Sequence, residues 1–398
     1  MRNRPGRLPE RVATVAIAAL VQLVAASVAW APAAEAQTAS SVTLASSAAT
    51  IAYGGRVTLS GSVSPAAGGQ TVEVLDDTDA IVTTATTDTA GAFTVDYAPG
   101  SSVTLRAVWQ SVASDPVTIG VRAIVDVRLS MVRLFDTVTV RGSVAPAHPG
   151  AKVEVSLVHA GDVVAQHHAA MGSAGGFATT FSIDQPGTYR VRATFADADH
   201  LRGSAHDGPR TTPLPPLHVG SRSVYVKLLE RRLVELHYRL VGVNRGYDDR
   251  TADAVVAFRK VQGMQRVFTV DTAVWRALAD PKIPRPRFDM KRFHFEVDQT
   301  RQVLYTVQDG RVTNILHVST GKPSTPTPDG SYHVYSKCPC LTSLGLYYPS
   351  FFDGGRALHG YVEVPVYAAS HGCVRIPYWN AKWVYRLAVV GTPVMVYH

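Results

Sequence analysis

The chain has 398 residues, of which 46% are hydrophobic, and it carries a formal net charge of +8 with only three cysteines. This length exceeds what one hydrophobic core usually supports, so we expect three or four domains. The positive charge is compatible with an anionic partner. Nucleic acid is a poor candidate for that partner, because the sequence shows no basic helix and no interleaving of aromatic and basic residues.

The first 36 residues have the pattern of a secretory signal peptide. Arginines at positions 2, 4, 7 and 11 precede an apolar run over residues 12–30, and Ala34-Glu35-Ala36 predicts cleavage before Gln37. The alternative is an uncleaved membrane anchor, because the run approaches the ~20 residues that span a bilayer. Either interpretation places the bulk of the chain outside the cytoplasmic membrane, as a secreted or cell-wall protein.

The sequence pattern predicts two copies of one β module, over residues 37–121 and 122–212. Residues 56–65 align with residues 137–146, and residues 105–109 with residues 191–195, at a spacing of a little over eighty residues. Each copy alternates short Val/Thr-rich runs with Gly, Pro and Asp turns, which predicts an all-β sandwich. The copies resemble bacterial immunoglobulin-like modules, and we expect them to act as spacers. We expect His167 and His168 to lie on a solvated strand surface, since adjacent strand side chains point to opposite faces.

A proline-rich linker over residues 211–216 precedes a region of helical periodicity, residues 219–280. Leu229, Leu233 and Leu236 predict one helix, and Ala254, Phe258 and Val261 predict a second that ends before Gly263. Thr251 is the candidate N-cap of the second helix. A shorter helix around Trp275 completes a small three-helix domain.

Residues 228–240 together with residues 247–260 resemble the peptidoglycan-binding helical domain that accompanies many cell-wall enzymes. The resemblance implies binding of wall glycan. Arg231 and Arg259 stand where that family usually has Gln, so a helical spacer is the alternative.

A second proline-rich linker over residues 281–287 precedes a β-rich region, residues 289–398. Alternating apolar residues predict strands over residues 293–297 and 303–307. Asp309-Gly310 predicts a hairpin turn leading into a third strand. One late helix is expected over residues 379–387. The expected fold class is therefore multidomain and mainly β, with two sandwiches, three helices and a β-rich domain.

The most informative passage for chemistry is His359 followed by Ser370-His371-Gly372-Cys373. A thiol near pKa ~8.5 is mostly protonated at neutral pH, and only its thiolate attacks, so a nearby histidine is needed to take the proton. His359 can approach Cys373 from a neighbouring strand, whereas His371 is too close in sequence to do so unless the segment is extended. Gly372 permits a sharp turn, so that backbone N–H groups could converge on an oxyanion.

These residues resemble the active-site motif of the L,D-transpeptidase family of bacterial cell-wall enzymes. His359-Gly360, the fourteen-residue step to Cys373, and the flanking segments 318–332 and 391–397 all fit the family. The resemblance covers residues 289–398, a length suited to one compact domain. Arg375 stands where many members have Asn, although Arg also occurs there.

The resemblance implies a role for each matching residue. Cys373 would be the nucleophile, His359 the base and then the acid, and the carbonyl of Gly360 would orient the imidazole. Backbone N–H groups at His371, Gly372 and Cys373 would form an oxyanion hole. Binding of substrate would fall to three residues: Ser370, Arg375 and Tyr348. For Tyr348, packing in the core is the alternative.

The resemblance further implies an exported enzyme that acts on peptidoglycan stem peptides and glycan in the cell wall, and no cofactor is expected. Attack on a tetrapeptide stem would release D-Ala, leave a thioester and then give a 3→3 cross-link. Two alternatives stay open: an L,D-carboxypeptidase or thiol hydrolase that uses water as acceptor, and a non-catalytic wall-binding adhesin.

The cysteines and histidines also allow two other interpretations. His359, His371 and Cys373 could be three zinc ligands, although no fourth ligand lies nearby and Glu363 is the only close carboxylate. Cys338 and Cys340 could form a small-loop disulfide or stay a reduced pair, and in the first case Cys373 is the remaining free thiol.

Overall fold

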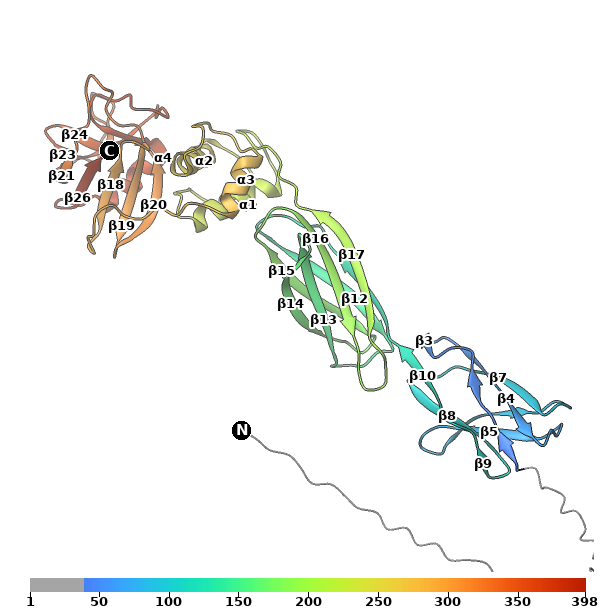
Figure 1. The fold of residues 1–398 in the computed structure, drawn as a ribbon. Coiled ribbons are helices and arrows are strands. Elements are labelled where there is room, and N and C mark those ends of the chain that lie inside the picture. The colour runs from blue at the N-terminus through green and yellow to red at the C-terminus, as the bar shows by residue number, and fades with distance from the viewer. Residues whose placement is uncertain (1–38) are drawn as a thin grey trace, which may run out of the picture.

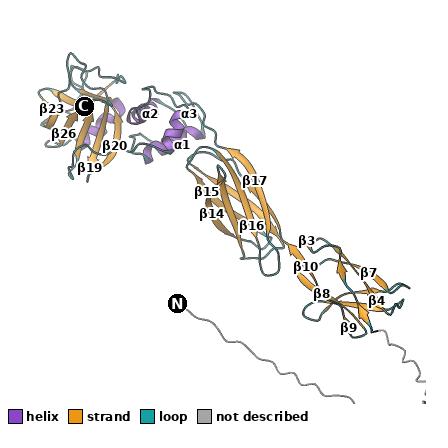
Figure 2. Cartoon of the chain, viewed as in Figure 1, coloured by secondary structure: helices purple, strands orange, loops and turns teal. Residues whose placement is uncertain are grey.

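The computed structural model describes residues 39–398, so the predicted signal peptide and its cleavage site lie outside the described residues. The described chain is mainly β, with four helices, and its modules follow one another in sequence order (Figures 1 and 2). This confirms the multidomain, mainly β fold class, while the domain limits drawn from the sequence stay predictions. Within residues 39–398 no helix combines the length and the apolarity needed to cross a bilayer.

The first module is a sandwich of two sheets. One sheet has the order β1-β4-β2 with β7 on the free side of β4, and the other has the order β3-β10-β8-β5-β6 with β9 beside β8. The strands are β1 (Ser41–Val42), β2 (Ala45–Ser46), β3 (Thr50–Ala52), β4 (Val57–Ser64), β5 (Thr71–Leu75), β6 (Ile81–Thr86), β7 (Ala92–Tyr97), β8 (Val103–Trp109), β9 (Val112–Ala113) and β10 (Val117–Arg122).

The second module packs a three-stranded sheet, β11-β12-β15, against a four-stranded sheet, β14-β13-β16-β17. The strands are β11 (Ile124–Leu129), β12 (Asp136–Ala145), β13 (Lys152–His159), β14 (Asp162–Ala170), β15 (Gly176–Ile183), β16 (Thr188–Phe195) and β17 (Gly203–Thr211).

The sequence repeat corresponds to a repeated packing contact. Gly61 in β4 pairs with Phe93, and Gly142 in β12 pairs with Phe177, in the same antiparallel register. In both modules a Cβ atom on the glycine would collide with the phenylalanine ring and with a backbone oxygen, that of Thr43 in the first module and that of Asp126 in the second. Glycine is therefore required at both positions because the ring lies directly over the backbone.

Three helices follow, α1 (Val224–Glu235), α2 (Asp249–Gln262) and α3 (Thr272–Ala279). Gly263 ends α2 with φ 73°, in the left-handed region, as the sequence predicted. The prediction that Thr251 caps α2 is wrong. Asp248 is the N-cap, because its carboxylate accepts hydrogen bonds from the N–H groups of Arg250 and Thr251. Thr251 lies inside the first turn, and its hydroxyl donates to the buried Glu230 at 2.6 Å.

The last domain contains two sheets and one helix. The first sheet has the order β20-β19-β18-β26-β21, and the second has the order β22-β23-β24-β25. Asp309 and Gly310 form the predicted hairpin turn, both with positive φ. The elements are β18 (His294–Asp298), β19 (Val303–Gln308), β20 (Arg311–His317), β21 (Gly330–His333), β22 (Ser336–Lys337), β23 (Tyr347–Asp353), β24 (Arg356–Tyr361), β25 (Val374–Pro377), α4 (Tyr378–Leu387) and β26 (Pro393–Tyr397).

The three helices and the first of these sheets share one apolar core. Residues of α2 such as Phe258 pack in the same cluster as Tyr305 and Ile315 from β19 and β20. The backbone of Ile315 also bonds to the helical region, where it accepts from Arg239 N–H at 2.9 Å and donates to His237 O at 2.8 Å. The helical region is therefore joined to the last domain by both apolar packing and hydrogen bonds.

Candidate active site

The second sheet brings the predicted base and nucleophile together. Strands β24 and β25 are parallel neighbours, with Leu358 opposite Val374 and His359 opposite Arg375. Opposed residues of parallel strands point to the same face, and so do residues two apart along one strand. His359 and Arg375 therefore share a face with Cys373, which directly precedes β25. The opposite face is covered by α4, since a Cβ atom at Gly360 would collide with Ala381 of that helix.

His359 is held in the tautomer that a base requires. Its side chain is buried, with 3% relative exposure, and Nδ1 lies 2.9 Å from the carbonyl oxygen of Gly360. A carbonyl can only accept, so Nδ1 carries the proton and Nε2 of the neutral ring keeps a lone pair. Burial lowers the pKa of His359 to about 4, and the charge of Arg375 acts in the same direction, while the Gly360 bond opposes both.

Cys373 is the free cysteine of the described chain. Burial raises the pKa of its thiol, and a backbone hydrogen bond from Ala357 and the charges of Arg356 and Arg375 oppose that effect. Since the base has a lowered pKa and the thiol a raised one, the resting pair is a neutral thiol and a neutral imidazole. In such a pair the thiol proton would pass to the imidazole when the sulfur attacks.

The turn before Cys373 is held by hydroxyl groups. Gly372 has φ 109°, in the left-handed region. Ser370 Oγ accepts from the Gly372 N–H at 3.1 Å and donates to the Cys373 carbonyl at 2.6 Å. Thr327 Oγ1 donates to the Gly372 carbonyl at 2.9 Å and accepts from the Gly321 N–H at 2.9 Å. Ser370 is buried, and its hydroxyl is engaged within the turn, so the structure favours a role in holding the turn over contact with substrate.

The same hydrogen bonds decide which amides are available for an oxyanion hole. The Gly372 N–H is already bonded to Ser370. Among residues 39–398, the backbone N–H groups of His371 and Cys373 have no protein acceptor. Two of the three amides expected from the sequence are therefore available. The His371 side chain is exposed and lies 3.3 Å from Lys322 Nζ, so it is not placed as the base.

Arg375 belongs to an aromatic cluster that the sequence analysis missed. Its guanidinium lies over the ring of Tyr361 at 4.3 Å, and Tyr361 meets the imidazole of His359 edge-on at 5.7 Å. Tyr361 follows His359 by two residues, so strand alternation alone could have placed it on the same face.

Tyr348, which was expected to bind substrate, lies on the other side of the sheet. Its ring meets Tyr385 of α4 edge-on at 5.1 Å, and Lys382 of the same helix lies over it at 5.3 Å. Its neighbour Tyr347 stacks on Tyr378, the first residue of α4. We therefore leave Tyr348 out of the proposed site, because the sheet separates it from the face that carries His359.

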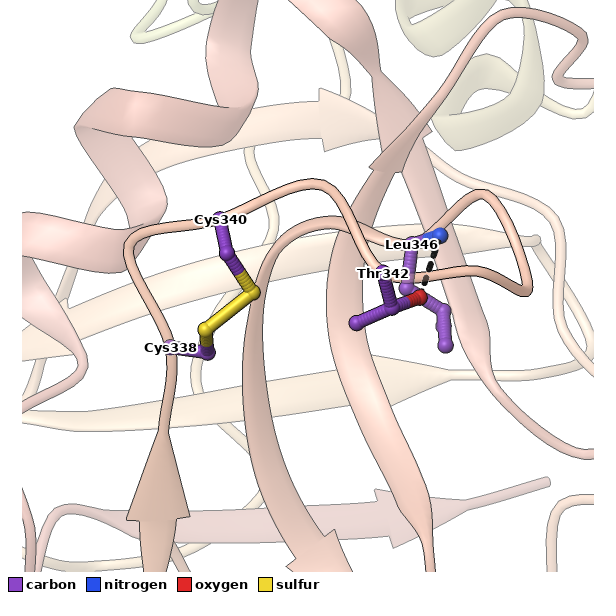
Figure 3. Close-up of a disulfide and its surroundings, with 4 residues drawn as sticks. All are labelled: Cys338, Cys340, Thr342 and Leu346. Carbon is purple, nitrogen blue, oxygen red and sulfur yellow. Dashed lines mark hydrogen bonds between the residues drawn. A yellow bond between two sulfur atoms is a disulfide. The ribbon is translucent and has the colours of Figure 1, made fainter.

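The other two cysteines are bonded to each other, and the three proposed zinc ligands are not gathered around one point. Cys338 and Cys340 form a disulfide in the segment between β22 and β23, where Thr342 accepts from the Leu346 N–H at 3.1 Å (Figure 3). The zinc hypothesis required His359, His371 and Cys373 to gather their ligand atoms. Those three atoms do not all lie within 4.8 Å of one another.

The segment between the two parts of the motif, residues 362–369, is anchored by His317 of β20 and by Arg266 of the helical region. His317 Nε2 donates to the Val364 carbonyl at 2.8 Å, so its Nδ1 accepts from Lys260 Nζ at 2.6 Å. Arg266 donates to the Val366 carbonyl at 3.1 Å. These contacts could not be predicted from the sequence, because Lys260 looks like an ordinary helix-surface residue and Arg266 like an ordinary loop residue until the domains pack.

Lys260 is buried although it is ionisable. Besides His317, its Nζ donates to the carbonyls of Gln302 at 2.8 Å and Val318 at 3.1 Å. Three acceptors match the three N–H groups of the ammonium form. Burial lowers the pKa of Lys260, and also that of His317. The chain directly beyond Val318 supplies the backbone that pairs with Arg375, so Lys260 supports the site from behind.

Comparison with known proteins assigns a family to the last domain. Residues 292–396 match the family model of the L,D-transpeptidase catalytic domain (YkuD). L,D-transpeptidase 1 of Mycobacterium tuberculosis is 31% identical over 110 residues, which is 22% of this chain and 44% of that protein. The chain therefore spans less than half the length of this curated relative.

Solved structures of L,D-transpeptidases also match. The enzyme of Xylanimonas cellulosilytica (its residues 123–326) is 31% identical, with a TM-score of 0.44, covering 48% of this chain and 100% of that one. The catalytic domain of the Enterococcus faecium enzyme is 27% identical, with a TM-score of 0.25, covering 28% and 100%. On the family match, residues 292–396 of this chain are an L,D-transpeptidase catalytic domain.

Proposed function

We propose that this chain is an exported peptidoglycan L,D-transpeptidase that forms 3→3 cross-links through a thioester on Cys373. The observation that carries the proposal is the tautomer of His359. Its Nδ1–H donates to the carbonyl of Gly360. The lone pair of Nε2 is therefore free on the face of the sheet that His359 shares with Cys373. The two unpaired amides of His371 and Cys373 support it by offering donors to an oxyanion.

In the first half-reaction, Cys373 Sγ attacks the carbonyl between the third residue of a tetrapeptide stem and its terminal D-Ala. The thiol proton passes to Nε2 of His359 as the S–C bond forms. The C–N bond then breaks, D-Ala leaves as an amine that takes this proton, and the thioester remains. The oxyanion formed in between accepts hydrogen bonds from the amides of His371 and Cys373.

In the second half-reaction, the side-chain amine of a neighbouring stem attacks the thioester. Its proton passes to Nε2, the C–S bond breaks, and the thiolate recovers the proton as the new amide forms. With water as acceptor the same residues would give a carboxypeptidase. The acceptor is therefore decided by how far the site excludes water.

The helical region supports wall binding. A cleft of about 650 Å³ lies where the chain enters α1 and α2, and it is lined by polar and charged side chains that include Arg222, Asn244 and Asp248. Such groups suit the hydroxyl and amide groups of a glycan or stem peptide. We propose that this cleft holds peptidoglycan while the shared core keeps the catalytic site at a fixed distance from it.

The test is mass spectrometry of the chain beginning at Gln37, incubated with a disaccharide-tetrapeptide. The proposal predicts a cross-linked dimer that lacks one D-Ala, and no product with Cys373→Ala or His359→Gln. The matched control is His333→Gln, which removes an exposed histidine of β21 and should leave the product unchanged. Tripeptide without dimer would favour the carboxypeptidase. Absence of both product and acyl-enzyme would favour the adhesin.

A further inference from the structure

A second cluster of chemically active side chains lies far from Cys373, where the two sandwich modules meet. His148 lies in the loop between β12 and β13, and Asp197 and His200 lie in the loop between β16 and β17. One ligand atom from each of the three lies within 4.8 Å of the others. The second loop also reaches the first module, since the Leu201 N–H donates to the Val121 carbonyl at 2.7 Å.

The hydrogen bonds of His200 leave a lone pair facing a carboxylate. Its Nε2 lies 2.9 Å from the carbonyl of Gly100 in the first module, which can only accept, so Nε2 carries a proton. In the neutral ring Nδ1 is then a lone pair, and it lies 3.0 Å from Asp197 Oδ1. Two acceptors at this distance require a cation between them, either a proton or a metal ion. A backbone carbonyl that fixes the far nitrogen is the usual support for a metal-binding histidine.

The other two atoms of the cluster are without partners. His148 Nε2 and Asp197 Oδ2 lie 3.3 Å apart, and within residues 39–398 both are buried atoms that make no hydrogen bond. Asp197 Oδ1, in contrast, accepts from the backbone N–H groups of Asp199 at 3.0 Å and His200 at 2.7 Å. The loop therefore fixes the carboxylate and directs its free oxygen at His148.

We propose that His148, Asp197 and His200 form a Zn²⁺ site at the joint between the two modules. Two imidazoles and a carboxylate are a donor set that zinc accepts, with a fourth position for water. Tetrahedral bonds of about 2.0–2.1 Å place neighbouring ligand atoms about 3.3 Å apart. His200 Nδ1 lies 3.0 Å from Asp197 Oδ1 and His148 Nε2 lies 3.3 Å from Asp197 Oδ2, so each oxygen of the carboxylate faces one imidazole. The bound ion would tie the two loops together, and through the Gly100 hydrogen bond it would stiffen the joint.

The test is equilibrium dialysis of the tagless full chain against Zn²⁺, followed by metal analysis, in a Cys373→Ala background that removes the free thiol. The site variants are Asp197→Asn and His148→Gln. Asn keeps an oxygen that can accept from the backbone N–H groups of Asp199 and His200, and His148→Gln replaces a half-exposed ring. The matched control is His168→Gln, an exposed histidine on β14 of the same module. Co²⁺ in place of Zn²⁺ reports the ligand geometry through its visible absorption.

The proposal expects one equivalent of metal in the background and in His168→Gln, with a tetrahedral Co²⁺ spectrum. Affinity should fall at least about a hundredfold in both site variants. Circular dichroism without metal shows whether each variant is folded. If Asp197→Asn is unfolded, the metal affinity of His148→Gln decides the result. Metal binding that survives in a folded site variant would overturn the proposal. So would the absence of binding, which would make the cluster a protonated ion pair.

Discussion

Replacing Lys260 by Met tests whether the helical region supports the catalytic site. Met keeps the length of the side chain and removes its charge and donors. Three buried acceptors lose their partner, namely the carbonyls of Gln302 and Val318 and Nδ1 of His317. Each unsatisfied buried group costs about 1–3 kcal/mol. We expect a loss of stability at the lower end of the summed cost, about 3 kcal/mol, because Met also removes the cost of burying an ammonium.

The assay is hydrogen exchange with mass spectrometry, because a multidomain chain need not unfold in one transition. In Lys260→Met we expect faster exchange in peptides from residues 311–320 and 362–369, which contain His317 and Val364. Acylation of Cys373 should slow by about ten- to a hundredfold, since the turn that carries it is less well positioned. Exchange in the two sandwich modules should not change.

The matched control is Lys227→Met, which removes an exposed lysine on α1. If Lys260→Met and Lys227→Met show the same hydrogen-exchange rates and the same rate of Cys373 acylation, Lys260 does not hold the site. The reasoning from its three hydrogen bonds is then refuted. A uniform loss of protection in all domains would show unfolding of the chain and would equally contradict a local role.

Three further outcomes follow from the site. Ser370→Ala should slow acylation more than it raises KM, because the hydroxyl bonds the turn at Gly372 and Cys373, and a rise in KM alone would indicate substrate contact. Alkylation of Cys373 by iodoacetamide should accelerate with pH to an apparent pKa above that of an ordinary thiol, since burial raises the pKa of the thiol, and a lower value would contradict the neutral pair. Burial lowers the pKa of His359 from 6.5 to about 4, so between these values the unfolded chain binds the extra proton and stability falls as the pH falls. That loss is up to about 3 kcal/mol. Hydrogen exchange of β24 between pH 7 and 4 should show it, and His359→Gln should reduce the slope.

The approach of His359 to Cys373 could be predicted because its signal is local. His359-Gly360 and Ser370-His371-Gly372-Cys373 are short segments whose order and spacing are specific, and parallel pairing of β24 and β25 then brings them together. The repeat was visible for the same reason. Each copy keeps a glycine that meets a phenylalanine ring, Gly61 with Phe93 and Gly142 with Phe177.

Other assignments failed or were missed because they depend on contacts between distant segments. The sequence placed the cap of α2 at Thr251, but Asp248 satisfies the first amides, and Thr251 instead meets Glu230 from α1. Tyr348 was expected at the substrate, yet it packs on α4. Only the folded chain shows which face of a sheet a helix covers.

The amino-acid sequence by itself determined the order of the modules, the mainly β class and the motif that carries Cys373 and His359, because periodicity, turns and motifs are properties of neighbouring residues. The tertiary structure decided the tautomer of His359, the amides that stay unpaired, the burial of Lys260 and the cluster of His148, Asp197 and His200. These depend on distance and desolvation, which are fixed only when residues far apart in the chain share one buried environment.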